Sequence, residues 1–297
     1  MGLGYCAYDI LSIVPHMPVF DDVRMTHASE MVHDGGGPVG TALAAIARLQ
    51  GGLSTGYLGV LGDDREGRTL RDLFVQAGVD VRRLRMQAGA GTNVCLLLVE
   101  EGTARRAIIC RPKVGSEALT LDEADRAYIQ GARVLHLDGQ FMPAAIQAAR
   151  WARQAGVKVC FDGNHPRPGL DALLPLVDWL VVAEPFPAAY TGLADSEEAA
   201  LALLALGPEL LAVTLGPRGC RVWADSERFE APGFAVEAVD TTGAGDAFHG
   251  GLIYALLQGW DLPRAAAFAN AVAALNCCTL GGRRGLPTLT QVQTLLE

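Results

Sequence analysis

Residues 240–251 read Asp-Thr-Thr-Gly-Ala-Gly-Asp-Ala-Phe-His-Gly-Gly and are the most informative stretch of the chain. They follow a strand-like segment, 234–239, and from Ala247 onward apolar residues recur at helical spacing. The Thr and Gly residues in between predict a turn that opens a helix. Because the first N–H groups of a helix have no partner inside it, they can converge on an anion, helped by the helix dipole. The amides concerned are those of Gly243, Ala244, Gly245 and Asp246.

A carboxylate, Asp246, lies within this run of amides. An acidic residue in a first turn often caps the helix, and capping is the alternative explanation. A carboxylate beside a bound phosphate would repel it, however, unless it accepts a proton from a substrate hydroxyl. A helix N-terminus should make Asp246 a weak base, but phosphoryl transfer has a loose transition state that asks little of the nucleophile. We therefore interpret Asp246 as the general base of a phosphoryl transfer.

Length, composition and charge limit the possible functions. The chain has 297 residues, half of them hydrophobic, which is enough for one large α/β domain over 1–297 with an appendage. A net charge of −9 argues against nucleic acid and anionic membranes as partners, and charges and prolines interrupt the apolar stretches before they reach the length of a membrane span. These features favour chemistry on a small molecule.

Cysteine and histidine patterns indicate no disulfide framework or zinc motif. The seven cysteines are scattered without a Cys-x-x-Cys pair, and we expect reduced thiols in a cytoplasmic protein. The N-terminus has no basic segment of the kind that opens a signal peptide. The six histidines have no spacing typical of zinc ligands, so surface, core or substrate-binding roles are expected for them.

From about residue 116, helical and strand-like segments alternate. This pattern predicts a doubly wound α/β fold, with a mainly parallel sheet flanked by helices. In such sheets ligands lie beyond the carboxyl ends of the strands, which here carry Asp138, Asp162, Glu184 and Gly216. Gln140, just beyond Asp138, is a further candidate substrate ligand. The expected helices are 121–130, 143–155 and 197–206, and the expected strands are 134–137, 157–161, 179–182 and 210–215.

Two other segments do not fit that layer. Residues 14–32 and 91–112 contain short alternating or β-branched runs with glycine and charge between them, which predicts a small antiparallel sheet. Closure of such a sheet over a site would exclude water from the reaction.

Position for position, residues 240–251 resemble the C-terminal signature of the ribokinase (PfkB) family of carbohydrate kinases. In that family the last Asp deprotonates the sugar hydroxyl and the preceding amides form an anion hole, which maps onto Asp246 and onto Gly243, Ala244 and Gly245. The resemblance implies ATP-dependent phosphorylation of a small sugar or sugar derivative. It also implies that the small sheet is a lid over the sugar and a contact of a homodimer.

The resemblance also implies the residues that hold the sugar. Asp9, which we expect to end an N-terminal strand, matches an Asp that binds two sugar hydroxyls, and a carboxylate suits adjacent hydroxyls; a loop cap is the alternative. The turn 35–42 matches the N-terminal motif, with Gly36 and Gly37 close to the polyol. Thr41 stands where the family has a sugar-binding Asn, and a change in sugar preference is expected.

For the nucleotide, the turn after strand 210–215 resembles the family's phosphate loop, with Thr214, Gly216 and Gly219 near ATP. Taken alone, this stretch is more typical of a tight β-turn than of a nucleotide loop. Asn270 falls where the family contacts adenine, although a solvated or satisfied helix Asn is the alternative.

The metal ligands depart from the family pattern. Its Asn-x-x-Glu element should fall at 183–186, which reads Ala-Glu-Pro-Phe, so Glu184 alone offers a carboxylate. Mg²⁺ is still expected, because it neutralises phosphate charge and keeps most of its waters. Asp240 and Thr242 are candidates for a K⁺ site. The sequences of residues 35–38, 184–185 and 281–287 are most similar to those of the sulfofructose-kinase-like branch.

The identity of the acceptor stays open. Along 105–112, Arg111 shares one strand face with Ala107 and Ile109, and Arg106 shares the other with Ile108 and Cys110. If the first face meets the sugar, Arg111 could bind an anionic group; if the second does, a neutral sugar or nucleoside is favoured. The net charge leads us to expect a neutral sugar. The alternatives are a nucleoside or hydroxymethyl-pyrimidine kinase and a catalytically silent sugar- or nucleotide-binding regulator.

Overall fold

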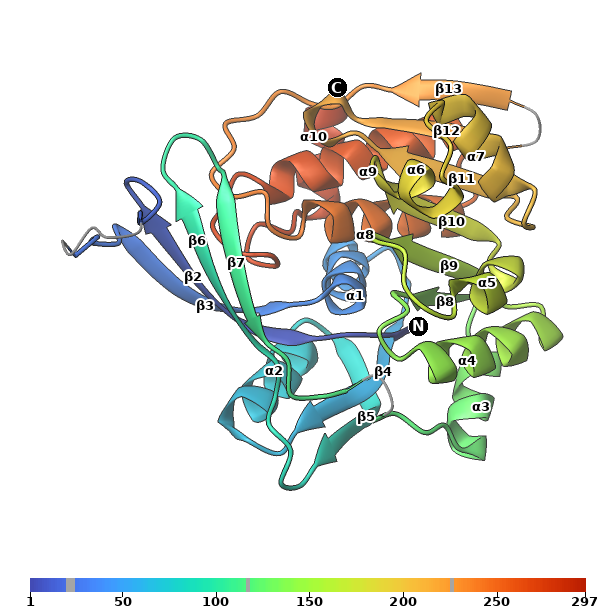
Figure 1. Cartoon of the computed structure of the whole chain (residues 1–297), viewed down its shortest axis with the longest axis horizontal. Coiled ribbons are helices and arrows are strands. Elements are labelled where there is room, and N and C mark those ends of the chain that lie inside the picture. Colours follow the sequence, from blue (N-terminus) through green and yellow to red (C-terminus); the bar gives the residue numbers. More distant parts are fainter. Residues whose placement is uncertain (20–24, 116–117, 225–226) are drawn as a thin grey trace.

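The computed structural model describes residues 1–19, 25–115, 118–224 and 227–297. Its centre is a nine-stranded sheet in the order β13-β12-β11-β10-β9-β8-β1-β4-β5 (Figure 1). The strands from β11 to β5 are parallel, and β12 and β13 add an antiparallel edge. The strands are β1 (Gly2–Leu3), β4 (Thr55–Gly62), β5 (Val79–Gln87), β8 (Val134–Leu137), β9 (Lys158–Gly163), β10 (Trp179–Ala183), β11 (Leu210–Thr214), β12 (Cys220–Ala224) and β13 (Glu227–Ala231).

Helices cover both faces of this sheet, which confirms the doubly wound α/β prediction. One layer contains α1 (Pro38–Leu49), α2 (Arg65–Gln76), α8 (Ala244–Leu257), α9 (Leu262–Asn276) and α10 (Leu289–Leu296). The other contains α3 (Glu123–Gln130), α4 (Met142–Gln154), α5 (Leu170–Leu173), η1 (Leu174–Leu176), α6 (Phe186–Thr191) and α7 (Ser196–Leu204). Within the described part of the chain, no helix is long and apolar enough to cross a membrane.

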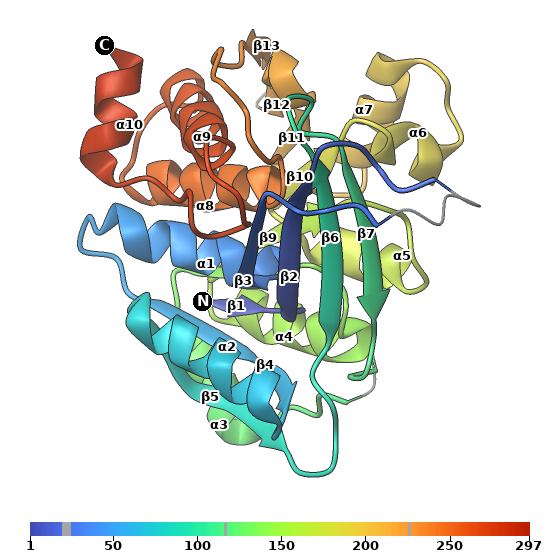
Figure 2. The same ribbon diagram turned by 90° about the vertical axis from the view of Figure 1, so that its left-hand side faces the viewer.

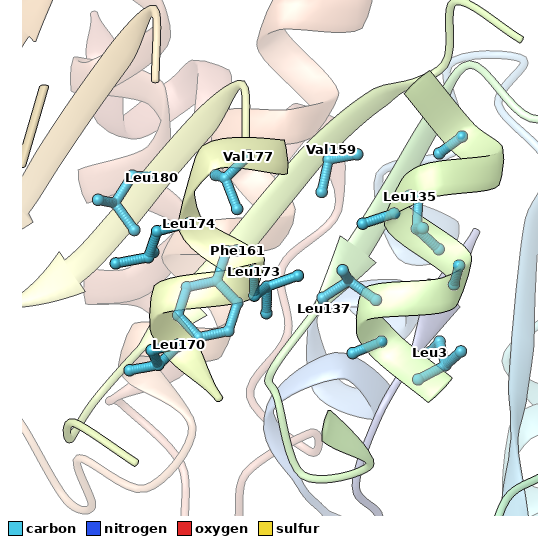
Figure 3. Close-up of a cluster of buried hydrophobic side chains, with 14 of the residues drawn as sticks. Leu3, Leu135, Leu137, Val159, Phe161, Leu170, Leu173, Leu174, Val177 and Leu180 are labelled. Carbon is cyan, nitrogen blue, oxygen red and sulfur yellow. The ribbon is translucent and has the colours of Figure 1, made fainter. Parts of the chain in front are cut away.

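The central strands are buried on both faces, as a parallel sheet between two helical layers requires. Leu135, Leu137, Val159 and Phe161 pack toward the α4 and α5 side (Figure 3). The residues that alternate with them face α1, α8 and α9. This alternation sends His136 of β8 and Cys160 of β9 toward helix α8, which follows the signature turn.

A second, four-stranded sheet stands over one end of the large one (Figure 2). Its order is β3-β2-β6-β7, formed by β2 (Ala7–Val14), β3 (Glu30–Gly36), β6 (Val94–Glu100) and β7 (Arg106–Arg111). The predicted lid therefore exists, but its boundaries and pairing were partly wrong. It starts at Ala7 rather than at residue 14, and β2 and β6 pair in parallel, so the sheet is mixed. Residues 20–24 of the predicted lid lie outside the described residues.

Two lid cysteines correct the expectation that all thiols are reduced. Cys95 of β6 and Cys110 of β7 are directly opposite each other in the antiparallel ladder and form a disulfide. Alternation along a strand predicts the face of a side chain but not its partner on the next strand, so the sequence did not reveal this pair. The other cysteines, Cys6, Cys160, Cys220, Cys277 and Cys278, are free.

Candidate active site

The signature turn is held by a buried carboxylate. Asp240 accepts hydrogen bonds from the Thr242 amide (2.9 Å), the Thr242 hydroxyl (2.7 Å) and the Gly281 amide (3.0 Å). Gly243 then ends the turn in the left-handed region, at φ 74°, and α8 begins at Ala244. A Cβ at Gly243 would lie 2.6 Å from the Gly282 carbonyl oxygen, so only glycine fits this conformation and this approach.

The start of α8 leaves backbone donors available. The first helical hydrogen bond runs from the Ala247 amide to the Gly243 carbonyl at 2.8 Å. Among the described residues, the amides of Gly243, Gly245 and Asp246 have no acceptor. The Ala244 amide differs, because it makes a long bond to the Thr241 carbonyl at 3.3 Å. The turn therefore has the donors that an anion-binding helix N-terminus needs, with Ala244 partly engaged.

Asp246 is half-buried in the first turn of α8, next to these donors. Burial and the negative charge of Asp162 raise its pKa to about 7, against the lowering effects of His249 and Arg283. The expectation of a weak base was therefore wrong, because burial outweighs the helix dipole. A carboxylate with this pKa can accept a proton near neutral pH.

Asp9 lies in lid strand β2, not at the end of the first strand as expected. The first strand ends at Leu3, and the chain bends before β2 begins at Ala7. The Asp9 side chain is 5% exposed and fills the space beside Gly36, where a Cβ would collide with its carboxylate. Burial raises its pKa to about 7; Arg283 opposes this rise, and the carboxylates of Asp34, Asp246 and Asp240 add to it. Asp9 and Asp246 are thus close enough to affect each other's ionisation.

The glycine turn is shorter than its sequence indicates. Gly36 ends β3, Gly37 has φ 98°, and α1 already begins at Pro38, which suits the first turn of a helix. Thr41 is therefore inside α1 and fully buried, and its hydroxyl accepts a 3.3 Å hydrogen bond from Arg283 Nε. The predicted sugar ligand at this position is already engaged by an arginine.

Arg283 is the residue that sequence reasoning missed at this site. Its amide donates to Asp34 at 2.9 Å, and its Nη2 donates to the Gly36 carbonyl at 2.8 Å. The guanidinium also lies 4.7 Å over the Phe74 ring. Arg283 thus joins loop 281–285 to the glycine turn. The Gly-Gly-Arg sequence of that loop was the available signal, but the sequence alone does not say which residues the Arg283 side chain contacts.

The lid arginine that shares a face with Asp9 is Arg106, not Arg111. Asp9, Cys95 and Cys110 are opposite one another in register, so the lid face that carries Asp9 also carries Ile108 and Arg106. Arg106 Nη1 donates to the Thr241 hydroxyl beside the signature turn. Arg111 lies on the opposite face, and its assignment as a substrate ligand was therefore wrong. Alternation defines two faces but does not say which one points inward.

Gln140 and its neighbours lie beyond the carboxyl end of β8, as predicted. The Gln140 amide donates to Asp138 at 3.0 Å, and the Tyr5 amide donates to the same carboxylate at 2.7 Å. Burial raises the pKa of Asp138 to about 6. Asp138 therefore ties the bend between β1 and the lid to the loop that carries Gln140.

Three of the residues predicted to contact the nucleotide lie around the end of β11. Thr214 ends this strand, Gly216 (φ 60°) opens η2 (Gly216–Arg218), and Gly219 (φ 95°) closes the turn. Asn270 of α9 is committed elsewhere, because its Nδ2 donates to the carbonyls of Ala231 (3.0 Å) and Pro232 (3.1 Å). Of the alternatives for Asn270, the satisfied helix side chain is the one observed.

Glu184 lies next to the same turn but is not free. Its amide donates to the Thr214 carbonyl at 3.1 Å, and its carboxylate forms a bidentate pair with Arg218 at 2.5 and 2.7 Å. The side chain is 54% exposed, so water can replace Arg218. The carboxylate oxygens of Asp240 already accept N–H and O–H donors, which does not fit the predicted K⁺ ligand pair with Thr242.

Comparison with known proteins agrees with this geometry. The family model described as pfkB family carbohydrate kinase matches residues 2–289. An ATP-dependent ribose-1-phosphate kinase from Halopiger xanaduensis is 32% identical, covering 100% of this chain and 97% of its own, and a rice fructokinase-1 is 30% identical over 96% and 95%. The crystal structure of a putative ribokinase from Agrobacterium tumefaciens superimposes with a TM-score of 0.87 at 26% identity, over 99% of this chain and 95% of that one. The chain belongs to the pfkB family of carbohydrate kinases.

Proposed function

We propose that the protein transfers the γ-phosphoryl group of ATP to a hydroxyl of a small sugar, with Asp246 as the general base. One observation carries this proposal: a carboxylate with a pKa of about 7 is on the first turn of a helix whose N-terminal amides have no acceptor among the described residues. The two features are complementary, because one accepts the hydroxyl proton and the other binds the phosphate that the hydroxyl attacks.

In the proposed reaction the sugar hydroxyl donates its proton to Asp246 and attacks the γ-phosphorus, and the bond to the β-phosphate oxygen breaks. The amides of Gly243 and Gly245 then stabilise the negative charge on the transferred group. Asp9 positions the acceptor through its other hydroxyls, and the turn at Gly36 admits the sugar close to the backbone. The lid face with Asp9 excludes water from the reaction.

Mg²⁺ is part of the proposal, because bound to ATP it would neutralise the phosphate charge. Glu184 is the residue that would hold the ion through a bridging water, once water has replaced Arg218 in their exposed ion pair. K⁺ is not part of the proposal, since Asp240 is committed to hydrogen-bond donors.

We favour a neutral sugar as the acceptor. The inner face of the lid carries buried Leu11 and Leu97 and exposed Ile108 beside two carboxylates, Asp9 and Asp34. Arg106, the arginine on this face, is engaged with the Thr241 hydroxyl. Carboxylates attract hydroxyl donors and repel anions, and the −9 net charge gives no long-range attraction for an anionic substrate. Assignment to the sulfofructose-kinase-like branch stays a prediction.

The outer face of the lid supports a homodimer. The cytoplasm is the proposed location, because ATP is available there. Three apolar side chains on this face are strongly exposed: Met31 (62%), Leu96 (46%) and Ile109 (68%). Such a patch on a sheet face is typical of a protein interface. Light scattering after gel filtration should give a dimer mass for the wild type and a monomer mass for Ile109→Asp.

The activity is tested with Mg-ATP and a panel of neutral sugars, sugar acids, sugar phosphates, nucleosides and a hydroxymethyl-pyrimidine. ADP release above the ATP background with one neutral sugar is expected. Selective turnover of a nucleoside or of the pyrimidine would show instead that the protein is a nucleoside kinase or a hydroxymethyl-pyrimidine kinase. Absence of turnover with every acceptor, together with measurable sugar or nucleotide binding, would favour the silent regulator instead.

A further inference from the structure

Three side chains of the types that can bind a metal ion converge close to the proposed base. His136 of β8, Cys160 of β9 and His249 of α8 each place one ligand atom within 4.8 Å of the other two. His136 and Cys160 are directly opposite in neighbouring parallel strands, so both side chains leave the sheet on the same face. Helix α8 packs on that face, and His249 is one turn beyond Asp246. Because the ligands come from three separate elements, their spacing in the sequence gives no motif.

These side chains are buried without adequate hydrogen bonding. His136 is 1% exposed, Cys160 is 0% exposed and His249 is 3% exposed. Among the described residues, both ring nitrogens of His136 and Nδ1 of His249 have no hydrogen-bond partner. Unpaired polar atoms at this depth are rare in folded proteins and indicate a missing ligand or water. Their number in one place points to a bound species.

We propose that His136, Cys160 and His249 bind one divalent metal ion of the zinc class, separate from the Mg²⁺ of the nucleotide. Imidazole and thiolate ligands select zinc, cobalt or nickel over hard cations such as Mg²⁺. His249 Nε2 lies 3.4 Å from Asp162 Oδ2, which leaves Nδ1 for the ion. Asp162 Oδ2 has no hydrogen-bond partner among the described residues, so a small rotation of His249 would give the carboxylate–histidine–metal arrangement that is usual around such ions.

The geometry needs only a small adjustment. Bonds of about 2.0–2.3 Å in a tetrahedral site place ligand atoms about 3.5 Å apart. The atoms here are within 4.8 Å of one another, so contraction by about 1 Å is sufficient, and side-chain rotation can supply it. Binding converts the Cys160 thiol to a thiolate, and its proton leaves to solvent.

A cavity reaches one member of this cluster, His136. A cavity of about 880 Å³ opens at the amino ends of the central strands and is lined by His136 together with Met1, Thr55, Val134 and Ile253. An ion can therefore reach His136 without passing through the nucleotide or sugar side of the sheet. Once bound, it would fasten α8 to β8 and β9 and so fix the position of the helix that carries Asp246.

The test measures metal content and a cobalt spectrum on untagged, full-length protein. After dialysis against a weak chelator, mass spectrometry should find about one zinc-class ion per chain in the wild type. Cys160→Ser and His136→Leu should lose most of it. Cys220→Ser is the matched control, because Cys220 is a strand residue that is equally buried in the same hydrophobic core but lies outside the group of His136, Cys160 and His249. This control should keep the ion.

Cobalt gives the second readout, with circular dichroism confirming that each variant is folded. Co²⁺ added to metal-free wild-type protein should produce thiolate charge-transfer absorption that Cys160→Ser lacks. The proposal is overturned if wild-type protein carries no such ion and shows no cobalt spectrum, or if Cys160→Ser retains metal as well as Cys220→Ser. If His136→Leu does not fold, the near-isosteric Cys160→Ser decides the question alone.

Discussion

Replacing Arg283 by Met tests whether this side chain holds the sugar side of the site together. Arg283 Nη2 donates to the Gly36 carbonyl at 2.8 Å, and the guanidinium lies 4.7 Å over the Phe74 ring. Methionine keeps most of the volume and the contact with Phe74 but removes every donor and the charge. The variant therefore separates packing from the hydrogen bonds.

The expected cost follows from these contacts. A hydrogen bond from a charged donor contributes about 1.5–3 kcal/mol, and a cation–π contact about 0.5–2 kcal/mol. The 3.3 Å bond from Arg283 Nε to Thr41 is long and adds little. Since Arg283 is only half-buried, part of this energy is recovered by hydration, and we expect a loss of roughly 2–3 kcal/mol in the free energy of unfolding.

A second effect concerns Asp9. Arg283 is the strongest charge opposing the rise in the Asp9 pKa, so its removal raises that pKa further above about 7. Less Asp9 is then ionised at neutral pH, and KM for the sugar should rise while KM for ATP stays the same. The pH dependence of sugar KM should also move to higher pH.

Urea denaturation followed by circular dichroism gives the stability change, and initial rates between pH 6 and 9 give the KM values. Arg284→Met is the matched control, because Arg284 is exposed and only approaches Glu30 at 3.4 Å. Its loss should change stability by less than about 0.5 kcal/mol. If Arg283→Met were as stable as this control and had an unchanged sugar KM, the role given to Arg283 would be refuted.

Three further predictions concern other parts of the site. Burial raises the pKa of Asp9 from 3.8 to about 7, so its contribution to stability is present below about pH 4 and lost as pH rises toward 7. Urea denaturation should therefore find Asp9→Asn more stable than wild type at pH 8, by at most about 4 kcal/mol. Sugar binding by this variant should weaken. Gly243→Ala should cost about 1–3 kcal/mol and at least tenfold in turnover, because of the positive φ and the 2.6 Å approach to Gly282; wild-type kinetics would contradict this. Arg106→Ala should raise substrate KM, whereas Arg111→Ala on the outer face should not; the reverse pattern would contradict the assignment of the faces.

The sequence was sufficient for features that depend on neighbouring residues. Residues 240–251 contain the carboxylate, the turn and the helix start in one stretch, so the anion-binding helix N-terminus could be predicted from them. The alternation of helices and strands after residue 116 likewise predicted the doubly wound sheet, because apolar runs buried on both faces have a recognisable pattern.

Features that depend on long-range packing could not be predicted. Arg283 reaches Gly36 and Thr41 only because the fold brings loop 281–285 against α1 and β3. The inward face of β7, and with it Arg106 in place of Arg111, depends on how the lid docks. The raised pKa of Asp246, in helix α8, depends on burial and on Asp162, which lies on strand β9.

The most direct test of the central claim is the turnover of Asp246→Asn, measured with the best sugar and saturating Mg-ATP. The wild type should gain activity as pH rises through about 7, where Asp246 ionises and becomes able to accept a proton. The variant should bind ATP normally but lose about 10²-fold or more in kcat, with no rise through that pH range. Turnover within a few-fold of wild type, or the same pH profile in both proteins, would show that Asp246 is not the base.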